Sequence, residues 1–226
     1  KIKTDIHDNA SGWNTAIAAA RGELVCFLID YCWVYPDWLR DHWEFYHRNP
    51  GWSMSGYFDR YQYPPMEEPP IENLFSMFEE WFTDEYAQKY FAANEPLYCE
   101  RKGGAGIMQH DGKIEMPGEK IYLVNDSIPM KVLRKLNGLD ELLNGTYGII
   151  DVDVGIRANL AGHRFCLNPQ SVIARFGMPG EKPIPGAKKK RTGTPEDAYR
   201  FVQDRAERIR RGEEPVAVPK NFGAFE

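Results

Sequence analysis

Short runs of apolar residues alternate with polar segments along the chain, and their spacing predicts both helices and strands. Residues 14–20 have mostly small side chains and favour a helix. This helix is expected to end at Arg21 and Gly22. The next run, residues 23–29, is almost continuously apolar and ends at Asp30. A run of this length, bounded by Gly and an acid, is typical of a strand buried on both faces, as in a parallel sheet covered by helices.

The same alternation continues along the chain. Helices are predicted over residues 36–46, 72–90, 129–136 and 151–160 and from the cap at Thr194 to about Arg211, and short strands over residues 121–124, 164–167 and 171–174. Four prolines make residues 57–70 a predicted loop, and the glycine-rich residues 102–119 are expected to be irregular. The pattern predicts an α/β fold in which a mixed, mostly parallel sheet is flanked by helices.

The composition of the chain changes after Gly177. Prolines and glycines surround the basic run Lys188–Arg191, which is typical of a loop, and a new helix begins near Thr194. We therefore divide the chain into a domain, residues 1–177, and a tail of basic loop and C-terminal helix, residues 178–226.

Composition and charge narrow the class of protein. The 226 residues suffice for one substantial core, with 42% hydrophobic and 27% charged residues. A net charge of -5 gives no global attraction to nucleic acid or anionic lipid, so such a contact needs a local patch. The 4 cysteines include no CxxC pair, which argues against a zinc site. No signal peptide or transmembrane segment is visible, and a reduced, cytoplasmic setting is expected.

The acid at the end of the first apolar run is one candidate for chemistry. In open α/β sheets, ligands bind beyond the carboxyl ends of the strands. Asp30 at such an end could hold a cation that neutralises a diphosphate. The alternative is that Asp30 only caps the following turn.

A second candidate is the helix start after a glycine, at Gly148. Asp151 and Asp153 follow it, with Arg157 at helical spacing from them. A carboxylate at a helix start that faces a cleft suits a general base for an acceptor hydroxyl. Alternatively, both acids are first-turn residues that the helix dipole favours.

Two blocks of sequence resemble family 2 glycosyltransferases. Residues 14–39 contain Asn, a small helix, Arg-Gly-Glu, an apolar strand, an acidic motif and Pro-x-Trp-Leu. Residues 125–165 contain a polar turn, a helix, Gly-Leu-Asp-Glu where relatives have Gly-Phe-Asp-Glu, an Arg-bearing helix and Gly-His-Arg. Together the blocks cover roughly a third of the chain, in the order of the family. The resemblance implies a GT-A-like (Rossmann-like) fold and an inverting transfer from a nucleotide sugar, usually a uridine diphosphate sugar.

The resemblance also assigns residues to roles. Asp151 matches the second acid of the family's Glu-Asp motif and is the implied catalytic base. Asp140 and Glu141 match the acids of the acceptor-side turn. Asn14 and Arg21 match donor-side positions.

The chain departs from the family at its acidic positions. The family's Asp-x-Asp falls on Ile29, Asp30 and Tyr31, so only the middle acid remains, and Ile150 replaces the Glu before the base. We place Asp30 and Tyr31 at the donor, with Asp30 as the one candidate metal ligand.

A downstream His of the family, often a metal ligand, falls near Arg175 in this chain. A guanidinium can balance diphosphate charge without a metal. We therefore expect a weakened or absent requirement for Mn²⁺ or Mg²⁺, with Arg175 or the run Lys188–Arg191 assisting the leaving group. The alternative is that Arg175 is only a surface residue of a strand and that Asp30 still binds a metal ion.

Two further expectations concern the substrates. Relatives begin with a strand and helix that form the nucleotide pocket, and this sequence starts after them. We therefore expect a separate chain or segment that completes the sheet, a truncation, or an incomplete donor site. In the aromatic region from Tyr57 to Tyr98, Tyr61 and Tyr63 are the candidates for stacking on an acceptor.

Three functions remain open from the sequence. The first is a glycosyltransferase that acts on a glycan, a lipid carrier or a modified nucleobase. The second is a binding or scaffold protein that keeps the fold without turnover, which the degraded acidic motif favours. The third is a nucleic-acid-binding module that uses the basic run, and its binding would depend steeply on salt.

Overall fold

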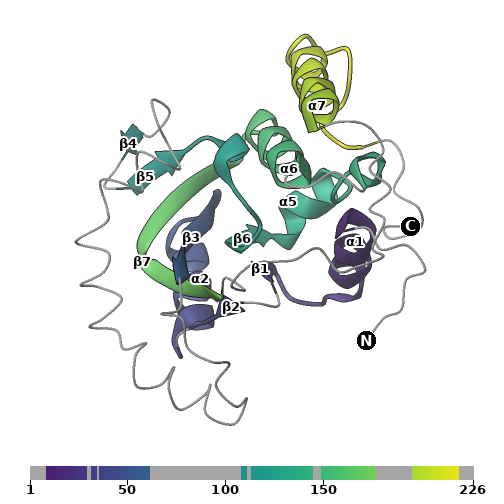
Figure 1. Cartoon of the computed structure of the whole chain (residues 1–226). Coiled ribbons are helices and arrows are strands. Elements are labelled where there is room, and N and C mark those ends of the chain that lie inside the picture. The colour runs from purple at the N-terminus through teal and green to yellow at the C-terminus, as the bar shows by residue number, and fades with distance from the viewer. Residues whose placement is uncertain are drawn as a thin grey trace, which may run out of the picture.

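A seven-stranded mixed sheet forms the centre of the structure (Figure 1). The structure is a computed structural model that describes residues 9–29, 32–34, 36–61, 108–110, 113–144, 149–176 and 195–218. The strands are β1 (Leu24–Leu28), β2 (Cys32–Trp33), β3 (Trp52–Tyr61), β4 (Met108–His110), β5 (Lys113–Met116), β6 (Asn125–Pro129) and β7 (Arg164–Phe176). The helices are α1 (Asn9–Ala19), α2 (Trp38–Arg48), α5 (Met130–Lys135), α6 (Ile149–Leu160) and α7 (Pro195–Arg210), with 3₁₀ turns η2 (Gly118–Lys120) and η3 (Glu141–Leu143).

The strand order is β1-β6-β3-β7-β5-β4, and β2 also pairs with β7. Within the described strands, β3 and β7 run parallel and the other pairs are antiparallel. The predicted α/β class, with a mixed sheet and flanking helices, is confirmed. The prediction that parallel pairs predominate is wrong for the described strands. A run of apolar residues indicates that both faces of a strand are covered, but it does not indicate the direction of the neighbouring strand. Helices can cover an antiparallel pair as well as a parallel one.

Side chains of β1 and β6 alternate between two helical layers. Trp13 of α1 packs edge-on against Phe27, with 5.7 Å between the ring centroids. On the opposite face, the indole N–H of Trp38 in α2 donates to the Asn125 side chain at 2.7 Å. Figure 1 shows α5 and α6 on the same side of the sheet as α1. The core fills both sides of β1 and β6.

The strand predicted over residues 121–124 is wrong, because that segment is a connection into β6 in which Tyr122 is exposed and the other three residues are buried. Leu123 there has a φ of 48°, which a strand residue does not adopt. The strand itself begins at Asn125 and is buried at every residue despite its polar start. The two strands predicted within residues 164–174 form a single strand, β7. Part of the segment expected to be irregular forms β4 and β5, and the helix predicted over residues 72–90 lies outside the described residues.

The C-terminal helix α7 packs onto the same core as the rest of the chain. Val202 and Ala206 of α7 are buried in the main hydrophobic cluster. After the helix, the backbone N–H of Val218 donates to the Leu136 carbonyl at 3.1 Å. The described part of the predicted tail therefore packs against the described part of the predicted domain, whereas the basic run Lys188–Arg191 lies outside the described residues.

Helix α6 approaches η2 so closely that only glycines fit. A Cβ atom added to Gly155 would lie 1.9 Å from the carbonyl oxygen of Gly118. We expect Gly155→Ala to lower the free energy of unfolding by about 3 kcal/mol, because backbone must move apart to admit the methyl group. Gly12 in α1 is the control, since a Cβ there meets nothing within 4 Å. Gly12→Ala should stabilise by about 0.5–1 kcal/mol in urea denaturation; equal effects of the two changes would contradict this packing.

Candidate active site

Asp151 lies in the first turn of α6 with its side chain half-buried. Burial raises the pKa of its carboxyl group to about 8, and the negative charge of Asp126 raises it further in the same direction. A carboxyl group that titrates near neutral pH at a helix start has the property required of a general base. The predicted helical position of Asp151 is confirmed.

Asp126 occupies the second residue of β6 and is almost completely buried. It pairs with Phe27 of β1 on one side and with Ser55 of β3 on the other. Its Oδ2 atom accepts from the backbone N–H of Val124 at 3.3 Å and of Tyr122 at 3.4 Å, both long contacts. Its Oδ1 atom has no hydrogen-bond partner in the described structure.

The carboxyl end of β1 reaches the same part of the sheet. Leu28, the last residue of β1, pairs with Asn125, the neighbour of Asp126. Asp126 in turn interacts electrostatically with Asp151. The candidate residues Asp30 and Tyr31, which follow β1, lie outside the described residues. This electrostatic interaction is the described link between the start of α6 and the strand that pairs with the end of β1.

A polar cluster on the other face of β6 holds this strand in place. The Asn125 Oδ1 atom lies 3.1 Å from the His42 Nε2 atom, and its amide donates to the Ser171 carbonyl at 2.9 Å. Burial lowers the pKa of His42 to about 4, so its ring is neutral at neutral pH. With Nε2 donating to Asn125, the buried Nδ1 atom is left without a partner in the described structure. The sequence pattern did not predict this cluster, because its members come from three separate elements, α2, β6 and β7.

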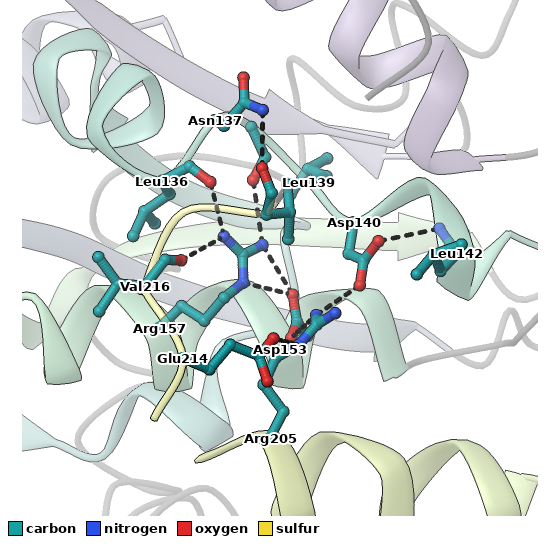
Figure 2. A network of polar contacts seen from close by, with 12 residues as sticks. Leu136, Asn137, Leu139, Asp140, Leu142, Asp153, Arg157, Arg205, Glu214 and Val216 are labelled. Atoms are coloured by element: carbon teal, nitrogen blue, oxygen red, sulfur yellow. Dashed lines mark hydrogen bonds and ion pairs between the residues drawn. The ribbon is translucent and has the colours of Figure 1, made fainter. Parts of the chain in front are cut away.

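The acidic turn assigned to the acceptor is tied into the protein (Figure 2). Asp140 is almost completely buried and forms an ion pair with Arg205 of α7. Its Oδ1 atom also accepts from the backbone N–H of Leu142 at 2.9 Å, capping η3. Glu141 is half-buried and accepts from the Asn14 amide at 2.9 Å. Asp140 therefore has internal partners on both oxygens, and Glu141 is the more accessible acid of the turn.

Two buried arginines hold this turn from below (Figure 2). Arg157 of α6 bonds to the Asp153 carboxylate at 2.7 Å and donates to the Gly138 carbonyl at 3.0 Å. It also donates to the carbonyls of Leu136 at 3.0 Å and Val216 at 3.3 Å. The other arginine, Arg205, bridges Asp140, Asp153 and Glu214. The role of Arg205 could not be predicted from the sequence, because its partner Asp140 lies 65 residues away along the chain.

The predicted donor residues on the first block fall in two different environments. Asn14 is fully buried, and its side chain both donates to and accepts from the backbone of Leu139, at 2.8 and 2.9 Å. These bonds resemble a β-bridge, and they give Asn14 a structural role that needs no ligand. Arg21 is exposed in the turn between α1 and β1. The two side chains do not share one surface.

The remaining predicted residues are placed by their backbone alone. Arg175 pairs with Cys32 of β2 and therefore lies beside the segment that follows Asp30. Tyr61 ends β3, where it pairs with Phe176 of β7. Tyr63 lies outside the described residues.

A groove of about 600 Å³ lies between the start of α6 and the outer face of α7. Its described lining residues are Ile149, Glu196, Tyr199, Arg200 and Gln203. Asp153 of α6 contacts Arg205 of α7, and Ile149, one turn earlier, lies on the same side of α6. Asp151 lies about 200° around the helix axis from Ile149. The groove is therefore separate from the surface near Asp151.

Further properties of the described residues bear on the class of protein. They contain no group of three or more His, Cys, Asp or Glu side chains that could hold a metal ion. Among the same residues, no helix combines the length and apolar character needed to cross a membrane. No family model matches the chain, and no curated protein is significantly similar to it.

Proposed function

We propose that the chain is a GT-A-type glycosyltransferase of family 2, and that Asp151 is its general base. The observation that supports this most is the raised pKa of the Asp151 carboxyl group at the start of α6. Asp126, which contributes to that pKa, lies on β6, the strand that pairs with the carboxyl end of β1. Ligands of open α/β sheets bind beyond such strand ends. The resemblance of both sequence blocks adds the reaction class.

The proposed reaction is a single displacement at the anomeric carbon of a nucleoside diphosphate sugar. The Asp151 carboxylate accepts the proton of the acceptor hydroxyl as that oxygen attacks. The new bond forms on the face opposite the diphosphate, and the bond from the anomeric carbon to the diphosphate oxygen breaks with its electron pair. The configuration of the sugar is thereby inverted. Arg175 is assigned to the leaving diphosphate by its position beside β2.

A divalent metal ion fits poorly at the donor side of this chain. Ile29 takes the place of the family's first acid, and its apolar side chain packs against the core. The proposed reaction therefore includes no step that needs a metal ion. Sugar transfer is expected to keep most of its rate in excess chelator, measured as release of uridine diphosphate with and without added Mn²⁺. A strict requirement for Mn²⁺ or Mg²⁺ would contradict this assignment.

The proposed function is tested by nucleotide release from a panel of uridine diphosphate sugars. We expect at least one donor to be turned over, and Asp151→Asn to lower kcat by roughly 10²–10⁴-fold, the usual contribution of a general base. Asp204→Asn, on the exposed side of α7, is the matched control and should keep the wild-type rate. Binding of a donor without turnover in the wild-type protein would favour the scaffold alternative, and no binding of any donor would refute the proposed function.

A further inference from the structure

We propose that the free edge of β1 is a dimerisation surface, where the same strand of a second copy of this chain adds in antiparallel orientation and extends the sheet. This inference does not depend on the proposed function. It rests on the direction of the backbone groups of β1, on the apolar character of the strand and on the symmetry of its sequence.

Strand β1 lies at one end of the described sheet, and β6 is the strand that it pairs with. Hydrogen-bonded residues alternate along an antiparallel pair, so every second residue of β1 turns its N–H and C=O groups toward β6. Just before the strand, the Glu23 carbonyl accepts from the backbone N–H of Met130 at 2.7 Å. Leu24 is therefore the first residue that turns its backbone groups away from β6. Pro129, which lies opposite Leu24, agrees with this register because it has no N–H to donate.

The same alternation directs the backbone groups of Leu24, Cys26 and Leu28 to the free edge. In the described structure, no strand pairs with this edge, and no backbone hydrogen bond from a turn or loop reaches these groups. Leu24 and Cys26 are half-buried, and Leu28 is 39% exposed. The edge of β1 thus presents alternating donors and acceptors with which a further strand can pair.

Neither β1 nor the helix that packs on it carries a charge that would keep a second strand away. The 5 residues of β1 are all apolar, and the strand has no lysine, proline or bulge, the features that usually protect an edge strand in natural proteins. Helix α1, which packs on Phe27 through Trp13, has no charged side chain. Its exposed residues include Ala16, Ala18 and Ala19. Surface helices ordinarily have charged or polar residues facing the solvent, so an uncharged exterior suits a contact.

The sequence of β1 favours a second copy as the partner. It reads Leu-Val-Cys-Phe-Leu, with a leucine at each end. Antiparallel pairing centred on Cys26 places Leu24 opposite Leu28 of the second copy, and Val25 then lies opposite Phe27, so that apolar side chains meet on both faces. Each outward N–H faces an outward C=O, and a two-fold axis closes the contact. A shift by one residue would set outward groups against inward ones, and a shift by two would leave one leucine of each strand unpaired.

Sedimentation equilibrium of the full chain measures the dimer. We expect the wild-type protein to dimerise and Leu28→Lys to weaken the dimer at least roughly tenfold, because a lysine on an edge strand opposes strand addition. Leu39→Lys is the matched control, since Leu39 is 62% exposed on α2 and its replacement should leave the dissociation constant unchanged. A wild-type protein that stays monomeric up to about 1 mM, or equal weakening by both changes, would overturn the proposal.

The register is tested by oxidation of the wild-type dimer. Opposite Cα atoms of a hydrogen-bonded antiparallel pair lie about 5.5 Å apart, within the range that a disulfide spans. We therefore expect a covalent dimer linked through Cys26, and no covalent dimer in Cys26→Ser, which keeps the other cysteines. A dimer that never cross-links through Cys26 would contradict the centred pairing of β1 with itself.

Hydrogen exchange, measured residue by residue, identifies what covers the edge. The amides of Leu24 and Cys26 should exchange slowly in the wild-type dimer, and fast in the Leu28→Lys protein at concentrations where it is monomeric. The amides of Val25 and Phe27 face β6 and should stay protected in both proteins. Slow exchange of the Leu24 and Cys26 amides in the monomer would mean that another strand covers this edge, and it would rule out the second copy as the partner.

Discussion

Replacing Asp151 with Asn is expected to make the protein more stable at pH 8 while it removes the proposed activity. Burial holds the pKa of the Asp151 carboxyl group at about 8 in the folded protein, against an ordinary value of 3.8. Between those pH values the folded state binds more protons than the unfolded state. The stability of the wild-type protein therefore falls as the pH rises from about 4 to about 8. Asn carries no charge at any of these pH values and avoids that loss.

The expected gain at pH 8 is on the order of 3 kcal/mol, less than the full shift implies because the side chain is half-buried. It is measured by urea denaturation of both proteins at pH 5 and pH 8. The difference in unfolding free energy should grow with pH in favour of the variant, and Asp204→Asn should show no such trend. A variant that is less stable than wild type by the same amount at both pH values would show that Asp151 is ionised at little cost.

Replacing Arg205 with Met is expected to cost about 3–5 kcal/mol of stability. This change leaves Asp140 and Asp153 buried without the cation that they share, and breaking one partner of a buried ion network is far more costly than losing a surface pair. Arg210→Met on the same helix is the control, because Arg210 is exposed and pairs with Glu207 at the surface. Its effect should stay below about 1 kcal/mol.

The Arg205→Met and Arg210→Met variants are compared with the wild-type protein by urea denaturation at pH 7. Arg205→Lys should restore part of the stability, since it returns the charge without the forked donors. A loss in Arg205→Met no larger than in Arg210→Met would contradict the view that α7 is fastened to the acidic turn by this network.

Most helices of the fold could be predicted from local signals: small residues in α1, apolar residues at helical spacing in α2, and the cap and first-turn acids of α7. The strands were harder to predict. Asn125, Asp126 and Ser127 look like a turn, yet they form a central strand, because helices cover both of its faces and the polar atoms of Asn125 find partners across the sheet. A local pattern contains no information about such partners.

The candidate site was predictable only where one residue carries the signal. Asp151 was placed correctly in the first turn of a helix. Asp126 was missed, because an acid in a buried strand is recognised as unusual only once the strand is known. Conversely, Asn14 and Asp140 matched a family motif, and the structure shows that both are engaged by protein groups distant in sequence. A sequence motif identifies residues that are important to the protein. It does not show whether such a residue supports a loop or contacts a substrate.

A crystal structure with a bound uridine diphosphate sugar tests the central claim most directly. We expect the diphosphate beyond Leu28, at the carboxyl end of β1. The Asp151 carboxylate should lie at most roughly 6–7 Å from the anomeric carbon, so that one acceptor oxygen fits between them. A donor bound in the groove between α6 and α7, or on the far side of the sheet from Asp151, would contradict it.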